Sequence, residues 1–109
     1  MAAKADIRLD ILIKREEDYY LAHCLQFDLV ATDDTLEGAK QAILDLCLAH
    51  IQFSAENDNL EYLFSPAPQE VWAEYLRLTK DESCDVFSKP LAGLPHLTPF
   101  TVQEVVCHA

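Results

Sequence analysis

Residues 6–51 constrain the fold more than any other segment, because their hydrophobic spacing changes from strand-like to helix-like partway along. The first stretch alternates apolar residues with mostly polar ones, which is typical of a strand with one buried face. A short polar turn at 15–18 separates it from a second strand at 19–25, so these two strands are expected to be antiparallel. A third strand is predicted at 29–32. The alternating apolar residues of the first strand are Ile7, Leu9, Ile11 and Ile13.

A long helix is predicted to follow, with Asp34 as its N-cap and Glu37 three residues later, and with Thr35 as the alternative cap. Apolar residues then recur at helical spacing, but Leu44 and Leu48 lie beside this stripe, so the helix is apolar around most of its circumference. Such a helix needs cover beyond the sheet, from a second helix, the C-terminal segment or another subunit. Leu44 and Leu48 are therefore candidate self-association residues, and a homo-oligomer is expected. The main stripe consists of Leu36, Ala39, Ile43, Leu46, Cys47 and His50.

A fourth strand is predicted at 60–65, where two closely spaced prolines end it, and a second amphipathic helix is predicted at about 69–79. The fold is therefore expected to be α+β: a three-stranded antiparallel sheet, a long helix, a fourth strand and a second helix. Residues 1–79 form the predicted domain. Prolines and a glycine interrupt residues 80–109, which predicts an irregular C-terminal tail with a terminal strand or docking arm at 100–106.

The charge of the chain excludes some partners and favours others. There are 19 acidic residues against 8 lysines and arginines, for a net charge of −11. Phosphate backbones repel such a surface, so no specific nucleic-acid binding is expected. The acidity either serves solubility or attracts a basic protein, one that itself binds nucleic acid.

The cysteines and the N-terminal sequence predict a cytoplasmic protein with reduced thiols. No C-x-x-C pair, apolar signal-peptide segment or membrane-spanning apolar run occurs in the sequence. His23 and His108 each neighbour a cysteine, but adjacent residues on a strand point to opposite faces, so neither a metal site nor a cofactor is expected. Burial as small apolar side chains is the better interpretation of Cys24, Cys47, Cys84 and Cys107.

The sequence does not point to catalysis. It contains no phosphate-binding glycine loop, zinc-protease helix motif or serine-hydrolase motif. His23 could act as a general base, but no serine or cysteine nucleophile lies at a sequence spacing that indicates a catalytic pair. His50 is predicted to be a hydrogen-bonded core or interface histidine. A metal-dependent nuclease of the ribonuclease H type would have to use Asp10 with Glu37 or Asp45. Asp10 is expected mid-strand and the other two on the outer strip of the helix, so no catalytic residue is assigned.

Two motifs carry a resemblance to a known family. The second strand contains Tyr-Leu-Ala at 20–22, and the third strand leads into Asp-Asp-Thr-Leu-Glu-Gly-Ala at 33–39. In this order, between three strands and an apolar helix, they resemble the HicB-like antitoxin domain. The likeness covers residues 6–55 and, more loosely, 60–79. It implies a degenerate ribonuclease H-like fold without the catalytic acids.

The resemblance also implies a partner. Antitoxins of this family bind a small basic RNA-cleaving toxin and cover its RNA surface, and they typically self-associate. Many carry a C-terminal DNA-binding module, but residues 80–109 contain only Lys80 and Lys89 as basic residues, so no such module is expected here. The sequence therefore predicts a non-catalytic binding protein that neutralises such a toxin, or a stand-alone relative. The alternatives are a structural or regulatory homo-oligomer without a toxin, or a metal-dependent nuclease.

Overall fold

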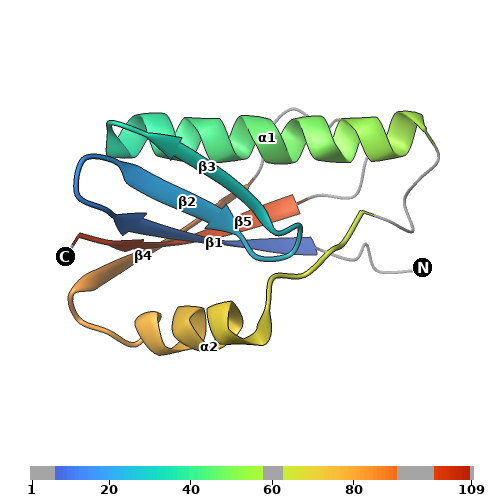
Figure 1. Ribbon diagram of the computed structural model, residues 1–109. Helices are drawn as coiled ribbons and strands as arrows, with labels where there is room; N and C mark the ends of the chain where they lie inside the picture. The colour runs from blue at the N-terminus through green and yellow to red at the C-terminus, as the bar shows by residue number, and fades with distance from the viewer. Residues whose placement is uncertain (1–6, 58–62, 91–99, 109) are drawn as a thin grey trace.

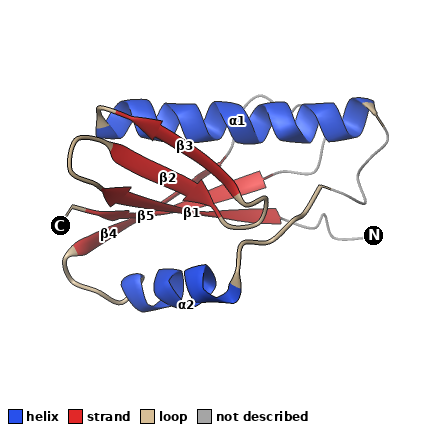
Figure 2. Cartoon of the chain, viewed as in Figure 1, coloured by secondary structure: helices blue, strands red, loops and turns tan. Residues whose placement is uncertain are grey.

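A computed structural model describes residues 7–57, 63–90 and 100–108 of the chain. They form one five-stranded mixed sheet with a helix on each face (Figures 1 and 2). The strand order across the sheet is β3-β2-β1-β5-β4. The elements are β1 (Ile7–Arg15), β2 (Tyr20–Cys24), β3 (Leu29–Asp33), α1 (Leu36–Glu56), α2 (Gln69–Leu78), β4 (Cys84–Pro90) and β5 (Phe100–Cys107).

The first half of the chain folds as its hydrophobic pattern predicts. β1, β2 and β3 form an antiparallel meander, in which Ile11 pairs with Cys24, and Cys24 pairs with Leu29. α1 follows directly and packs over β2 and β3 (Figure 1). The α+β class and the three-stranded antiparallel part of the sheet are thus confirmed.

The second half of the chain corrects the predicted strand order. Residues 84–90 and 100–107, within the segment expected to be an irregular tail, form β4 and β5, and β5 pairs in parallel with the central strand β1. Of the two alternatives predicted at 100–106, a terminal strand or a docking arm, the strand is the one that forms, and it lies inside the sheet. Of the fourth strand predicted at 60–65, residues 60–62 lie outside the described residues, and 63–65 are not a strand. Pro66 and Pro68 follow directly, and proline has no amide hydrogen to donate to a neighbouring strand.

Side-chain burial explains why β4 and β5 were difficult to predict. β5 is buried on both faces, so its apolar residues do not alternate with polar ones. β4 is exposed along almost its whole length, and its apolar residues Val86 and Phe87 are adjacent, so they point to opposite faces. Apolar and polar residues alternate in a strand that has one buried face and one face in solvent. Neither β4 nor β5 lies in such a position.

The start of α1 is fixed by two neighbouring side chains. Thr35, the alternative cap, is the N-cap: its Oγ1 accepts a hydrogen bond from the Gly38 amide at 3.0 Å. Asp33 Oδ2 in turn accepts hydrogen bonds from the Thr35 amide and hydroxyl, both at 2.9 Å. The buried stripe of α1 consists of Ala39, Ile43, Cys47, Ile51 and Ser54.

The sheet separates two hydrophobic cores. The core under α1 is the larger, and its biggest buried side chains are Phe27 from the β2–β3 turn and Phe100 from β5. The core under α2 is small and includes Leu12, Leu25, Tyr75, Leu78 and Val105. Because α2 lies on the opposite face of the sheet from α1, it does not supply the cover that α1 was expected to need (Figure 1).

None of the helices in the described part of the chain combines the length and the apolar composition needed to cross a bilayer.

Candidate functional site

The three carboxylates that a nuclease would need do not come together. Asp10 is buried on the face of the sheet that α2 covers, where it contacts Tyr75. Glu37 and Asp45 are exposed on α1, which packs on the other face. Among the described residues, no group of three or more histidine, cysteine, aspartate or glutamate side chains is placed to hold a metal ion.

Asp10 is instead the centre of a buried hydrogen-bond network. Its Oδ1 accepts from the Tyr75 hydroxyl at 2.8 Å and lies 3.0 Å from Arg8 Nε, while its Oδ2 accepts from Gln26 Nε2 at 2.7 Å. The Asp10 amide donates back to Gln26 Oε1 at 2.7 Å, and Gln103 Nε2 donates to the Tyr75 hydroxyl at 3.0 Å. The network joins β1, the β2–β3 turn, α2 and β5. A carboxylate satisfied in this way is suited to positioning α2 on the sheet.

Tyr75 holds its proton firmly in this network. Burial, followed by its hydrogen bond to the Asp10 carboxylate, raises the pKa of the Tyr75 phenol well above its ordinary value. The phenol therefore remains a hydrogen-bond donor to Asp10 throughout the physiological pH range. The sequence predicts Asp10 on the first strand and a helix at about 69–79 that contains Tyr75, but it could not bring the two residues together, because 65 positions separate them.

Glu104 is a second buried carboxylate, on the α1 side of β5, and sequence reasoning missed it. Its two oxygens lie 4.0 Å from Lys40 Nζ on α1 and 3.6 Å from Lys89 Nζ on β4. Lys40 Nζ also lies 4.8 Å from the centre of the Phe87 ring, within the range of a cation–π contact. The only signal in the sequence was a lone acidic residue within an apolar run. These contacts tie α1 and β4 to β5.

The histidines make local contacts. His50 Nε2 hydrogen-bonds the Leu63 carbonyl oxygen at 2.8 Å, and its ring centre lies 4.8 Å from that of Phe27. This confirms the prediction of a hydrogen-bonded histidine in the packing of α1. His23 Nε2 lies 2.6 Å from Asp28 Oδ1 at the β2–β3 turn.

The cysteines form two pairs, which corrects the expectation of four reduced thiols. Cys84 on β4 and Cys107 on β5 face each other in register and are joined by a disulfide. A sequence without known strand register cannot show this opposition. Cys24 and Cys47 are free and buried between β2 and α1. The hydrogen bond to Cys24, together with burial, raises the pKa of the Cys47 thiol, which therefore stays protonated.

The self-association candidates on α1 lie beside its core. Leu44 is half-buried and packs against the hydrophobic core under α1, and Leu48 is also half-buried. The most exposed large apolar residues of α1 are Leu46 and Phe53, at 38% and 61% exposure. Leu46, which was predicted to lie on the main stripe, is thus not part of the buried face of α1. The exposed apolar residues of the helix lie about half a turn away from Leu44 and Leu48.

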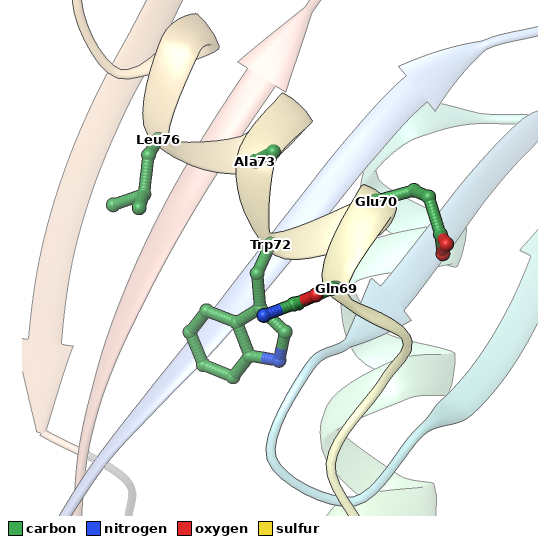
Figure 3. Close-up of a pocket in the computed structure, with 5 residues that line it drawn as sticks. All are labelled: Gln69, Glu70, Trp72, Ala73 and Leu76. Atoms are coloured by element: carbon green, nitrogen blue, oxygen red, sulfur yellow. The ribbon is translucent and has the colours of Figure 1, made fainter.

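A shallow hollow lies beside α2 and is lined by Gln69, Glu70, Trp72, Ala73 and Leu76 (Figure 3). Trp72 and Leu76 project from one side of α2, and Glu70 projects from the other (Figure 3). Leu76 is 57% exposed, whereas Trp72 packs partly against the core under α2. The hollow is a largely apolar surface feature, formed by residues of α2.

Many of the acidic residues in the described part of the chain lie at one end of the sheet. The β1–β2 turn, the β3–α1 connection and the start of β4 meet there (left end in Figure 1). Arg15 pairs with Tyr20 and Tyr20 with Asp33, while Lys14 pairs with Cys107 and Cys107 with Cys84. Each of the three segments contributes three carboxylates. We call this surface the acidic end: Glu16, Glu17, Asp18, Asp33, Asp34, Glu37, Asp81, Glu82 and Asp85.

Few positive charges offset the acidic end. Lys14, Arg15, Lys40 and Lys80 lie in or beside its three segments, and Lys14 is paired with Glu74 at 3.1 Å. Lys40 Nζ lies 3.8 Å from Glu37, and His108 Nε2 lies 3.1 Å from Asp85. Asp33 and Asp81 are held in place by local hydrogen bonds to Thr35 and Ser83, which lower the pKa of each carboxyl. Both therefore remain ionised at neutral pH. The acidic end is a fixed negative surface built on the ends of strands.

Comparison of the chain with protein-family models, with curated proteins and with solved structures finds no match. A function for the chain therefore has to follow from its own surfaces and from the resemblance in its sequence.

Proposed function

We propose that the chain is a non-catalytic protein-binding domain of the HicB antitoxin type, which neutralises a small basic RNA-cleaving toxin. The acidic end is the single observation that carries this proposal. It gathers nine of the 19 acidic residues, three from each of three segments that are distant in the sequence. A surface that binds RNA must be rich in lysine and arginine, so a negative surface of this kind is complementary to it.

The topology supports the same reading. β1, β2, β3 and α1 occur in the order on which the resemblance rests, and Asp33 and Thr35 of its second motif form the cap of α1. Asp10 is the strand carboxylate that a nuclease would use. It already accepts hydrogen bonds from Tyr75 and Gln26 and forms an ion pair with Arg8. These contacts favour a binding role over a catalytic one.

In this mechanism the chain competes with RNA for the toxin. The carboxylates at the strand ends attract the basic surface from a distance and speed the encounter, as opposite fields do in other protein pairs. Once bound, the acidic end occupies the positions that RNA phosphates would take. The interaction is expected to weaken as salt rises, because exposed charges are screened within about 10 Å at 0.1 M ionic strength.

Growth rescue tests the proposal. A small basic protein encoded beside this chain is expected to arrest growth when expressed alone, and the wild-type chain is expected to restore growth. A variant that removes one charge from each segment of the acidic end, Glu17→Gln with Asp34→Asn and Glu82→Gln, should fail to restore it. The matched control is Asp45→Asn with Glu56→Gln and Glu70→Gln, which removes three exposed charges elsewhere and should restore growth. Equal rescue by both variants would contradict the proposal.

Two alternatives remain distinguishable from it. A homo-oligomer without a toxin is favoured by the exposed Leu46 and Phe53, and it predicts no small basic partner in the gene neighbourhood or in native co-purification. A nuclease predicts cleavage of RNA or RNA–DNA hybrids on titration with magnesium or manganese. Cleavage that Asp10→Asn abolishes would overturn the non-catalytic reading.

A further inference from the structure

β4 forms one edge of the sheet and carries exposed apolar side chains on both faces. Among the described residues only β5 pairs with it. Val86, on the face of α2, is 45% exposed, and Phe87, on the face of α1, is 46% exposed. An edge strand with apolar side chains is a ready template for pairing with another strand. The other edge, β3, is shorter, and α1 packs on one of its faces.

The register between β4 and β5 shows which backbone groups of β4 point outward. The Cα atoms of Cys84 and Cys107 are 4.4 Å apart, the spacing of a non-hydrogen-bonded antiparallel pair. The backbone groups of Cys84, and those of every second residue after it, therefore point away from β5. The Cys84 amide already donates to the Asp81 carbonyl at 3.1 Å, and Pro90 has no amide hydrogen. The outward donors of β4 are thus Val86 and Ser88.

The sequence of β4 is complementary to itself when two copies run antiparallel. The register that overlaps the whole strand, 84–90 on 84–90, centres on Phe87 and places it opposite Phe87 of the second copy. Asp85 then lies opposite Lys89 of the second copy, and the symmetry repeats this pair. Val86 lies opposite Ser88 of the second copy, and these are the residues with outward donors. Charges, aromatic rings and donors all match in this one register.

We propose that two copies of the chain pair through β4 across a twofold axis at Phe87, which joins two five-stranded sheets into one sheet of ten strands. Val86 and Ser88 exchange backbone hydrogen bonds across the axis, and two Asp85–Lys89 pairs flank the Phe87 rings. The ladder stops at Cys84 and Pro90, because the amide of the first is occupied and the second has none. This dimer does not depend on whether a toxin exists.

The charge of the whole chain is compatible with this arrangement. The acidic end lies at the Cys84 end of β4, so antiparallel pairing sends the two acidic ends to opposite ends of the joined sheet. Repulsion between copies with a net charge of −11 is thereby reduced. The Asp85 and Lys89 side chains are 60% and 45% exposed, although they also contact His108 and Glu104 within their own copy. Both remain able to reach a second copy.

Light scattering of charge variants tests the dimer. The wild-type chain should reach twice its mass of 12.3 kDa as concentration rises. Asp85→Lys places lysines opposite Lys89 of the second copy and should weaken dimerisation on the order of tenfold. Glu82→Lys makes the same change of charge just outside β4 and should leave it intact. Mixing Asp85→Lys with Lys89→Asp should restore dimers, because both cross-strand pairs are then of opposite charge.

Hydrogen exchange supplies a second readout that does not depend on Lys89→Asp, whose new carboxylate would lie near Glu104. The Val86 and Ser88 amides should be protected in the wild-type chain in proportion to its concentration, and should exchange fast in Asp85→Lys. A wild-type chain that stays monomeric up to about 1 mM would overturn the proposal. So would a dimer that Asp85→Lys leaves unchanged while the Val86 and Ser88 amides exchange fast.

Discussion

The two faces of the sheet are closed by different physical means. On one face the 21-residue α1 seals a continuous apolar core that includes Leu9, Ile11 and Ile43. On the other face the 10-residue α2 covers a small core and is tied down by the buried network of Asp10 and Tyr75. The first face depends mainly on many apolar contacts, with Glu104 and its two lysine partners as a buried polar group among them. The second face has fewer apolar contacts and depends more on a few specific polar ones. The two faces should therefore respond differently to mutation, redox state and pH.

The largest effect is expected from a cavity under α1. Ile43→Ala removes a fully buried side chain and should lower the free energy of unfolding by about 2–5 kcal/mol, measured by urea denaturation. Leu78→Ala, which truncates a residue of the α2 face at 8% exposure, should cost less, because that core is smaller and more open. An equal loss of unfolding free energy for Leu78→Ala and Ile43→Ala would contradict the claim that apolar packing matters more on the α1 face than on the α2 face.

The next largest effect concerns the disulfide on the α2 face. Reduction of Cys84–Cys107 reopens a loop with a sequence separation of 23 and should lower the free energy of unfolding by about 3 kcal/mol, measured with and without reductant. The control is the Cys84→Ser, Cys107→Ser double variant, which should be insensitive to reductant. A wild-type chain with equal stability in both conditions would argue against this bond.

A smaller effect is expected from the polar network. Tyr75→Phe removes the hydroxyl that donates to Asp10 and accepts from Gln103, and should cost about 2 kcal/mol at neutral pH. Tyr19→Phe, at an exposed tyrosine, should be close to neutral. A cost for Tyr75→Phe no greater than for Tyr19→Phe would mean that the network does not hold α2.

The same network predicts a pH dependence. Because the pKa of Tyr75 is raised in the folded chain, its contribution to stability is complete below the ordinary tyrosine pKa of about 10 and is lost as pH rises above it. The wild-type chain should therefore lose stability above about pH 10 more steeply than Tyr75→Phe. Parallel curves for the two proteins would contradict the raised pKa.

The smallest effect concerns the start of α1. Thr35→Ala removes the N-cap and should cost about 1 kcal/mol. Hydrogen bonds from Thr35 lower the pKa of Asp33, so the stability that this carboxylate provides is present above about pH 4 and is lost as pH falls. Asp33→Asn should reduce the acid sensitivity of unfolding, and Asp34→Asn, at a neighbouring exposed carboxylate, should leave it nearly unchanged.

The contrast between the faces also explains what the sequence could predict. The meander and α1 follow from local periodicity and a local cap, so β1, β2, β3 and α1 could be placed from the residues themselves. β5 was recognised only as a terminal strand, because nothing local indicates that it pairs with β1. The adjacent apolar residues of β4, Val86 and Phe87, point to opposite faces, so no alternating pattern marked this strand. Parallel pairing between β1 and β5 joins residues more than 90 positions apart.

The surface features also divide into those that the sequence could predict and those that required the structure. The excess of acidic residues was evident from composition, but their concentration at one end required the strand register. The apolar girth of α1 was evident, but the exposed residues are Leu46 and Phe53 in place of Leu44 and Leu48. The partners of Asp10 and of Glu104 come from distant elements, and the opposition of Cys84 and Cys107 depends on a strand that the pattern did not reveal.

Hydrogen exchange of the chain with and without the small basic protein encoded beside it tests the binding role most directly. The proposed function predicts protection at the three segments of the acidic end, 16–18, 33–37 and 81–85, and no change at the β2–β3 turn on the opposite end. Protection that is confined to the opposite end, or binding that leaves all three segments unchanged, would contradict the claim that the acidic end is the binding surface.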